Sequence, residues 1–431
     1  MKTGVETADL IYPETGWIGF LKEHLGPSLM WALIGVGGSH IVLAPTLGGL
    51  YGFFAIWIVA LVYIAKYGGW ELGIRYNYGV GKNPVEGYGD LPGPDHWGQW
   101  LTLAIYLVGW TTILAAVGFT SATFAGALVS GVTEIQLYVI LIGLSIALTL
   151  FSRYHWIENL MKVFVVSLAS LVVLGVFVSP PSATVVSETA FAVPDVTAPA
   201  FLGLFAAMAG YAPTGLSTTV TIGSWSLAKD QGARALREQN LDPNDAQYHD
   251  YISQWIQVGM RDFRLAYGFS FVLIVSMVFL ATAVLYPTPP QDQNVALAIG
   301  NLLREGFGTW SFYALVVGAF AALYSTVITV MDGAARVNAD ILPLVLEREM
   351  DHERLRRGFI LLMGTASILP ILAIGQLPVT LVVFSAALMA ILQVFFYIAN
   401  YVIVRKHLPE AFQPSALHRG YYFVTIVMVV I

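Results

Sequence analysis

Eleven apolar segments constrain this chain more than any other feature, because each is about long enough to cross a lipid bilayer as a helix. A spanning helix needs about 20 mostly apolar residues. Only 11% of the 431 residues are charged, against roughly 25% in soluble globular proteins. We therefore predict an all-α polytopic membrane protein with about 11 transmembrane helices. The segments are residues 26–49, 51–75, 98–131, 135–151, 156–179, 198–228, 263–286, 308–337, 357–375, 377–404 and 418 onward.

The positions of the basic residues give these segments an orientation. With the N-terminus placed in the cytoplasm, 20 of the 21 lysines and arginines fall in the N-terminal tail, in inner loops or at inner helix ends. Lys66 is counted among them, and Arg304 is the exception. Basic residues concentrate on the cytoplasmic side of membrane proteins. We therefore expect a multi-pass protein of the cytoplasmic (inner) membrane with a cytoplasmic N-terminus.

The first apolar segment is interrupted near its middle. Residues 35–40 read GVGGSH, so three glycines, a serine and a histidine stand where a simple anchor would be apolar. Helix-breaking backbone at that depth is tolerated only where it is buried in protein or lines a watery cavity. The interruption therefore predicts a transport site.

The sixth segment carries a matching interruption. Residues 208–215 read MAGYAPTG, and Pro213 removes a hydrogen bond from the helix ladder. Two broken helices five segments apart are typical of an inverted-repeat secondary transporter, with its site between the breaks. We predict a cytoplasmic segment at 1–25, a first repeat of helices 1–5 at 26–180, an outer loop at 181–197, a second, inverted repeat of helices 6–10 at 198–404, and a loop and helix 11 at 405–431.

Several stretches resemble one family of transporters. They run from Gly26-Pro27 through the first break to Tyr51-Gly52, from Tyr67-Gly68-Gly69 to Gly81, from Tyr154 to Lys162, and over Ser325-Thr326. In these stretches the chain resembles the natural resistance-associated macrophage protein (NRAMP) family of proton-coupled divalent-metal transporters. The resemblance covers helices 1–10. It implies the LeuT-type fold, a 5+5 inverted repeat in which helices 1 and 6 are broken.

The chain departs from this family at the site itself. The family signature of helix 1, Asp-Pro-Gly-Asn, corresponds to residues 37–40, which read GGSH. The signature of helix 6, Met-Pro-His, corresponds to residues 212–214, which read APT. The Asp, Asn and Met side chains that bind metal in the family are therefore replaced in this chain.

These replacements bear on the substrate. Free N–H groups at helix N-termini favour anions, and neither break holds an acidic residue. Divalent metals need several oxygen, imidazole or sulfur ligands, whereas the breaks keep one imidazole. We therefore favour a small anion, bicarbonate first, with a divalent metal ion (Mn2+, Fe2+ or Mg2+) as the alternative. The expected substrate-binding residues are Gly37, Gly38, Ser39, His40, Tyr211, Ala212, Thr214 and Gly215.

Two questions about this site stay open in the sequence. His40 either contacts the substrate or is a buried donor to a backbone carbonyl. Coupling is the second question, because the stretch between Trp97 and Glu134 has no charged residue or histidine, whereas the family carries protons through acidic residues on helix 3. We expect uncoupled transport, or coupling to Na+ held by exposed carbonyls and hydroxyls.

Other polar groups are less specific. Asp332 and Arg336, one turn apart, predict an ion pair. Gln393 and Asn400 either bond between helices or line the path. Residues 229–262 form either a helix on the membrane surface or a polar connector.

The sequence speaks against an enzyme. Cysteine is absent, which excludes disulfides and thiolate sites, and no Gly-x-Ser-x-Gly or His-Glu-x-x-His motif occurs. We expect no cofactor and no nucleic-acid partner, but a small inorganic ion and the lipid bilayer; the oligomeric state stays open. The charged residues among the first 24 do not fit a signal peptide. Because the chain ends at Ile431 in an apolar run, we expect helix 11 to be incomplete.

Overall fold

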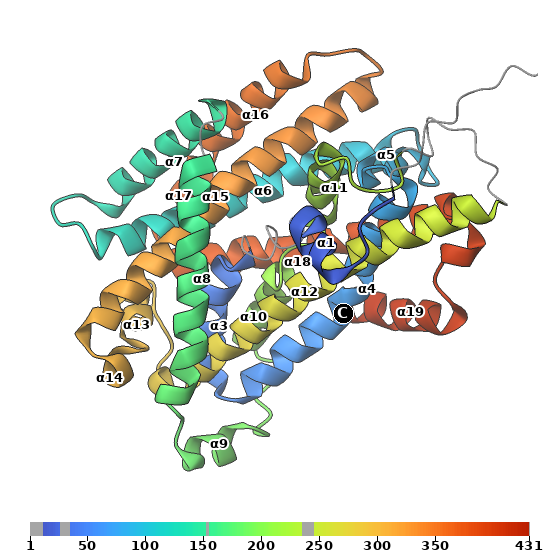
Figure 1. The fold of residues 1–431 in the computed structure, drawn as a ribbon. Coiled ribbons are helices and arrows are strands. Elements are labelled where there is room, and N and C mark those ends of the chain that lie inside the picture. Colours follow the sequence, from blue (N-terminus) through green and yellow to red (C-terminus); the bar gives the residue numbers. More distant parts are fainter. Residues whose placement is uncertain (1–11, 26–34, 152–154, 235–244, 431) are drawn as a thin grey trace, which may run out of the picture.

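The computed structural model describes residues 12–25, 35–151, 155–234 and 245–430, and these residues form helices and loops without any strand (Figure 1). The predicted all-α class is therefore confirmed. The main helices are α3 (Ala44–Tyr51), α4 (Phe54–Val80), α6 (Trp97–Gly126), α7 (Glu134–Phe151), α8 (His155–Val178), α10 (Pro199–Tyr211), α11 (Thr218–Ala228), α12 (Ala246–Leu285), α15 (Thr309–Leu346), α16 (His352–Ala366), α17 (Ile368–Ile374), α18 (Pro378–His407) and α19 (Ala416–Val430).

Short helical pieces lie between these helices. They are α1 (Trp17–Gly19), the π-helices η1 (Phe20–His24) and η2 (Ser39–Leu43), α5 (Pro84–Gly87), the 3-10 helix η3 (Tyr88–Asp90), α9 (Ala183–Thr189), α13 (Val295–Asn301), α14 (Arg304–Phe307) and the 3-10 helix η5 (Glu410–Phe412).

The long helices agree with the predicted spans. Within the described residues, seven helices are long and apolar enough to cross a membrane, and an eighth span results if the bent pair Val166–Val178 and Ala183–Thr189 is counted as one. The sixth segment is divided into shorter helices, as its interruption predicts. An arrangement of about 11 spans is compatible with these helices.

The seventh span is longer than the sequence predicts. Residues Ala246–Leu285 form one continuous helix of 40 residues, and the side chain of Asp245 caps its start by accepting from the N–H of Gln247. Tyr251 and Trp255 are buried on this helix. The apolar residues of the loop predicted at 229–262 therefore belong to an extension of the span, whereas residues 235–244 lie outside the described part of the chain.

The helices pack in two groups. Helices α3, α4 and α12 pack together, and so do α6, α7, α15 and α16. Figure 1 shows α6 and α15 running side by side. Helix α18 contacts members of both groups, and the pieces of the two interrupted segments, η2 and α10, contact each other and α18. This arrangement places both interruptions between the two groups of helices.

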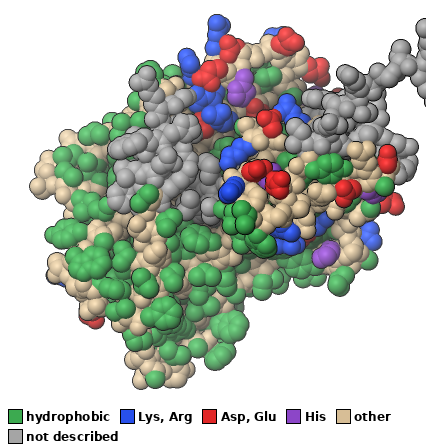
Figure 2. Space-filling model, viewed as in Figure 1, with side chains coloured by type: hydrophobic (Ala, Val, Ile, Leu, Met, Phe, Trp, Pro, Cys, Tyr) green, Lys and Arg blue, Asp and Glu red, His purple; other side chains and the backbone are tan. Residues whose placement is uncertain are grey.

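Charged side chains are unevenly distributed on the surface. On the face in Figure 2 they gather in the upper and right-hand parts, whereas green hydrophobic side chains with few charges cover the lower and left parts. The predicted Asp332–Arg336 ion pair is present at 2.7 Å. Asp332 is nevertheless buried and also binds Arg356 of α16 at 2.9 Å, so this pair belongs to a link between two helices.

Candidate functional site

The sixth segment is broken where its sequence predicts. Helix α10 ends at Tyr211 and α11 begins at Thr218, and residues 212–217 between them are not helical. The last carbonyls of a helix have no partner in the helix itself. The carbonyls at the end of α10 therefore need donors from elsewhere.

Gly210 allows α10 to lie directly against α18. A Cβ atom at this position would stand 1.7 Å from the carbonyl oxygen of Ala386. Only a residue without a side chain fits such a close approach of two backbones. The end of α10 is therefore fixed against α18 at the break.

The first break is described from residue 35 onward, because residues 26–34 lie outside the described part. Val36 and Gly37 form a turn, the π-helix η2 (Ser39–Leu43) follows Gly38, and α3 continues the segment. A Cβ atom on Gly35 would lie 2.7 Å from the carbonyl oxygen of Pro213. The two breaks are therefore in direct contact.

A small cavity of about 60 Å3 lies where the breaks meet. Since a buried water needs roughly 10–15 Å3, the cavity has room for about four waters, or for a small ion with part of its hydration shell. None of the described residues that line it is charged. They come from the first segment (Gly35, Gly38, Ser39), α6 (Trp110, Ile113, Val117), the sixth segment (Tyr211, Thr214, Gly215, Ser217, Thr218, Trp225), α15 (Thr326, Thr329, Val330) and α18 (Met389).

Most of the predicted substrate-binding residues line this cavity. These are Gly38, Ser39, Tyr211, Thr214 and Gly215. Gly37, His40 and Ala212 are buried beside the breaks but are not among the lining residues.

Three further helices, α6, α15 and α18, contribute lining residues that were not predicted from the sequence. Trp110 and Thr326 lie in polar interruptions of otherwise apolar segments, which is a usable signal. Met389 lies in a uniformly apolar stretch and gives none.

His40 is completely buried and bonds to protein on both sides of its ring. Its Nδ1 atom lies 2.7 Å from the carbonyl oxygen of Gly35, and Nε2 lies 3.1 Å from the carbonyl oxygen of Ser270 and 3.2 Å from its hydroxyl. A neutral imidazole has one N–H, so it donates to only one of these two carbonyls. We assign the proton to Nδ1 because its contact to Gly35 is the shorter one, and Nε2 then accepts from the hydroxyl of Ser270. In this arrangement His40 is a buried donor to a backbone carbonyl, which was one of the two alternatives.

Lys66 does not lie where the sequence predicted it. It was expected in an inner loop or at an inner helix end, but it lies near the middle of α4, where it is 1% exposed. Its Nζ atom donates to the carbonyl oxygens of Ala209 and Thr214, both at 2.6 Å, and to that of Gly210 at 3.4 Å. A buried lysine thus binds the carbonyls of the sixth-segment break. A single lysine in an apolar run is the sequence feature that could have indicated this role. The prediction instead placed Lys66 with the basic residues of the inner side.

Fixed hydrogen bonds hold the walls of the cavity. The hydroxyl of Tyr106 donates to the carbonyl of Ser217 at 2.7 Å, and the indole N–H of Trp110 donates to the hydroxyl of Ser217 at 3.2 Å. On the other side the hydroxyl of Tyr211 donates to that of Ser385 at 2.7 Å. These bonds join three of the elements that line the cavity, namely the sixth-segment break, α6 and α18.

Gln393 and Asn400 bond between helices, which was one of the two alternatives. The amide of Gln393 donates to the carbonyl of Ala209 at 3.0 Å. Asn400 accepts from the hydroxyl of Tyr88 at 2.7 Å and donates to the carbonyl of Gly69 at 3.3 Å. Neither residue lines the central cavity.

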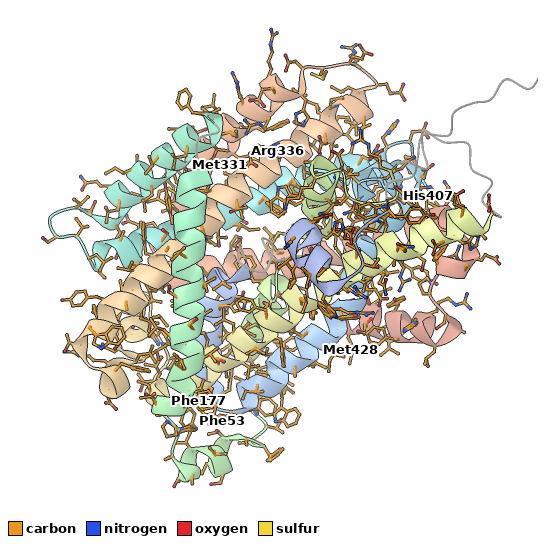
Figure 3. All side chains as sticks on the ribbon, in the orientation of Figure 1. Phe53, Phe177, Met331, Arg336, His407 and Met428 are labelled. Atoms are coloured by element: carbon orange, nitrogen blue, oxygen red, sulfur yellow. The ribbon has the colours of Figure 1, made fainter. Side chains whose placement is uncertain are left out.

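A second, larger cavity of about 450 Å3 lies further along the same helices. Arg336 lines it, and in Figure 3 this residue lies on α15 beyond Met331. His352 Nε2 and Asp340 Oδ1 are 2.9 Å apart at its wall. Within the described residues, no group of three or more His, Asp or Glu is placed to hold a metal ion. The described residues that line the larger cavity therefore include both basic and acidic side chains, whereas those that line the central cavity include no charged side chain.

The sequence of the chain matches one protein family over nearly its whole length. The model of the natural resistance-associated macrophage protein-like (Nramp) family matches residues 28–431. The chain belongs to the Nramp family. It is also 25% identical over 342 residues to the uncharacterized protein PM0681 of Pasteurella multocida, with 75% of this chain and 72% of that protein covered.

Solved structures show the same fold. The Eremococcus coleocola manganese transporter superposes on 98% of this Nramp chain and 87% of its own, with a TM-score of 0.72 at 12% identity. The transporter MhsT, in complex with L-phenylalanine, covers 93% of this chain and 97% of its own with a TM-score of 0.56 at 12% identity. Mhp1, a nucleobase-cation-symport-1 family transporter, covers 95% and 91% with a TM-score of 0.53 at 13% identity.

The predicted family and the predicted LeuT-type fold are thereby confirmed. Family and fold are those of membrane transporters and not of enzymes. At such low identity the superpositions establish the fold alone, so the cargo has to be argued from the chain's own residues.

Proposed function

We propose that this Nramp chain is a secondary transporter that moves a small inorganic ion by alternating access through the central cavity. The observation that carries the proposal is the contact of the two breaks around a cavity lined by the first segment, the sixth segment, α6, α15 and α18. Transporters built from inverted repeats bind their cargo at such breaks. The distribution of basic residues supports placement in the cytoplasmic membrane with the N-terminus inside.

A divalent metal ion is the first candidate cargo. Membership of the Nramp family and the fold shared with a manganese transporter support it. Ser39, Thr214 and Thr326 are hydroxyl-bearing residues of the cavity lining, and oxygen ligands with retained waters suit Mn2+ and Mg2+. Such a site would hold the ion largely hydrated, because none of the described lining residues has a carboxylate.

A small anion such as bicarbonate is the second candidate, and one specific observation favours it. The basic group bonded to the break is the side-chain nitrogen of Lys66, which donates to the carbonyl of the cavity-lining Thr214. In its ammonium form this side chain attracts an anion and repels a cation, and it acts strongly where water is excluded. Among the described residues, the cavity lining has no acidic side chain to oppose an anion.

Tracer uptake into proteoliposomes separates the two candidates. Purified protein is compared for uptake of labelled Mn2+ and labelled bicarbonate, with Gly215→Val as the blocking variant. A Cβ on Gly215 would lie 3.3 Å from the flexible end of Met389 and in ordinary contact with the hydroxyl of Ser217 at 3.5 Å and the carbonyl of Gly210 at 3.7 Å. Because Gly215 lines the cavity, we expect the added methyl groups of valine to narrow it. We expect at least a tenfold loss of uptake, equivalent to about 1.4 kcal/mol.

Gly203→Ala is the matched control, because a Cβ on Gly203, in the same segment, has no atom within 4 Å. Saturable Mn2+ uptake that Gly215→Val removes would support the metal cargo. Saturable bicarbonate uptake removed by the same variant would support the anion. The transport proposal fails if neither tracer enters above empty vesicles, or if Gly215→Val transports as well as Gly203→Ala.

A further inference from the structure

Lys66 raises a question that the transport proposal leaves unanswered. A lysine buried to 1% exposure in the middle of a spanning helix loses the hydration of its charge. No described carboxylate forms an ion pair with it. What surrounds its Nζ atom is backbone oxygen from Ala209, Gly210 and Thr214.

The number of acceptors indicates the charged form of the side chain. An ammonium has three N–H donors and can donate to all three oxygens, whereas a neutral amine has two and can donate to only two of them. Three carbonyl oxygens converge on Nζ, two at 2.6 Å and one at 3.4 Å. The geometry therefore suits a cation.

The position of these oxygens adds to the stabilisation. Ala209 and Gly210 belong to the last turn of α10, which ends at Tyr211. The C-terminal end of a helix carries partial negative charge and favours cations. Thr214 contributes its carbonyl from the non-helical stretch beyond, so the ammonium binds both sides of the break.

We propose that the sixth-segment break contains a monovalent-cation site, built from the carbonyls of Ala209, Gly210 and Thr214, which the chain fills permanently with the ammonium of its own Lys66. Carbonyls exposed at such a break are the groups expected to hold a coupling Na+. In this chain a covalently attached cation takes that place. The break is therefore stable without an external monovalent ion, and transport does not depend on Na+.

Removing the ammonium should turn the occupied site into a binding site for a free cation. Lys66→Ala deletes the side chain and leaves space beside the three carbonyls, and NH4+ restores the same N–H donors. Lys66→Met keeps a stem of similar length but has no donor, so the site stays filled and cannot be rescued. Lys406→Ala is the control for the loss of a lysine, because Lys406 is 49% exposed and pairs with Asp90.

The first measurement is thermal unfolding of the purified full chain in choline, sodium, potassium and ammonium chloride at equal ionic strength. A ligand that binds only the folded state raises the unfolding temperature. We expect no difference among salts for wild type, Lys66→Met and Lys406→Ala. We expect Lys66→Ala to unfold at a lower temperature in choline and to recover at least half of the loss in ammonium.

The unfolding temperatures support or overturn the proposed cation site. If Lys66→Ala yields folded protein only when it is purified in ammonium, that result also supports the site. The inference is overturned if Lys66→Ala responds to none of the cations, or if sodium stabilises the wild type.

The second measurement is uptake, and this arm alone rests on the proposed function. Uptake is measured with the tracer that the wild type accumulates. In choline, the uptake rate of Lys66→Ala should be about tenfold lower than that of the wild type, because one hydrogen bond to a charged group is missing. In ammonium, this variant should regain uptake. Wild-type uptake should be the same in sodium and in choline. Sodium-dependent wild-type uptake would contradict the inference, whereas absence of any uptake with normal unfolding results would contradict only the transport proposal.

Discussion

The breaks in the first and sixth segments both leave backbone carbonyls without helical partners, yet their new donors come from different places. At the first break the carbonyl of Gly35 accepts from the hydroxyl of Ser39 at 2.9 Å and from Nδ1 of His40 at 2.7 Å. Both donors lie in the same segment. At the sixth-segment break the carbonyl of Ala209 accepts from Lys66 of α4 and Gln393 of α18.

This difference has a consequence for movement. A break whose donors lie in its own segment keeps its hydrogen bonds when neighbouring helices shift. A break whose donors lie on other helices loses them when those helices move. The first break therefore keeps the two donors of Gly35 when helices shift, although His40 also bonds to Ser270 of α12. The end of α10 is held to α4 and α18, and a change of conformation has to exchange or carry along those bonds.

The largest expected effect is that of Gly210→Ala at the sixth-segment break. The added Cβ would meet the backbone oxygen of Ala386 at 1.7 Å, so α10 and α18 would have to separate. Overpacking costs about 1–3 kcal/mol and occasionally more. We expect a clear fall in unfolding temperature and loss of uptake, measured on the purified protein and in proteoliposomes.

Gly35→Ala makes the same change at the first break, where the nearest atom is the carbonyl oxygen of Pro213 at 2.7 Å. It should destabilise less than Gly210→Ala, and Gly203→Ala should be neutral or slightly stabilising because helical alanine is favoured over glycine. Equal unfolding temperatures for Gly210→Ala and Gly203→Ala would show that α10 is not held against α18.

A smaller effect is expected from removing the donors of the first break. Ser39→Ala and His40→Phe each remove one of the two side-chain donors to the carbonyl of Gly35, and only the double variant removes both. A buried carbonyl without a partner costs about 1–3 kcal/mol. We therefore expect the double variant to be less stable than the sum of the single effects by about 1 kcal/mol, within the range found for contacting residues.

Chemical unfolding of the four proteins gives this coupling directly. Ser270→Ala is a useful companion, because it changes the hydroxyl near Nε2 of His40 and leaves the bond to Gly35 in place. If the stability changes of Ser39→Ala and His40→Phe simply add in the double variant, the two donors do not share the carbonyl of Gly35. The proposal that this break is held by donors of its own segment would then be wrong.

The fold was largely predictable because its cause is local composition. Apolar runs of spanning length predicted the long helices, and Pro213 between glycines predicted the break between α10 and α11. The charge pair Asp332–Arg336 was predictable because residues one turn apart face each other on a helix. The added role of Arg356 was not, since it comes from another helix.

The site was only partly predictable for the same reason. Gly38, Ser39, Tyr211, Thr214 and Gly215 line the cavity because they stand in the breaks themselves. Lys66, Trp110 and Met389 reach the site from α4, α6 and α18, and no spacing within one segment reports such a meeting. His40 was placed in the substrate site because the spacing identifies a break, but it cannot tell which side of the helix a ring faces.

The smallest expected effect is that of Gln393→Leu, which removes the second donor at the sixth-segment break. The carbonyl of Ala209 keeps its bond to Lys66 at 2.6 Å. The side-chain oxygen of Gln393 is buried and accepts from no described residue, so the substitution also removes an unsatisfied acceptor. The two effects oppose each other, and we expect the stability to change by less than about 1 kcal/mol.

Unfolding of Gln393→Leu beside Lys66→Met ranks the two donors of this break. The lysine should dominate, because it binds three carbonyls on both sides of the break and the glutamine binds one. If Gln393→Leu destabilises more than Lys66→Met, the main attachment of α10 is to α18 and not to α4. The helix that carries the end of α10 during transport would then be α18, since a moving helix takes with it the partner it holds most strongly.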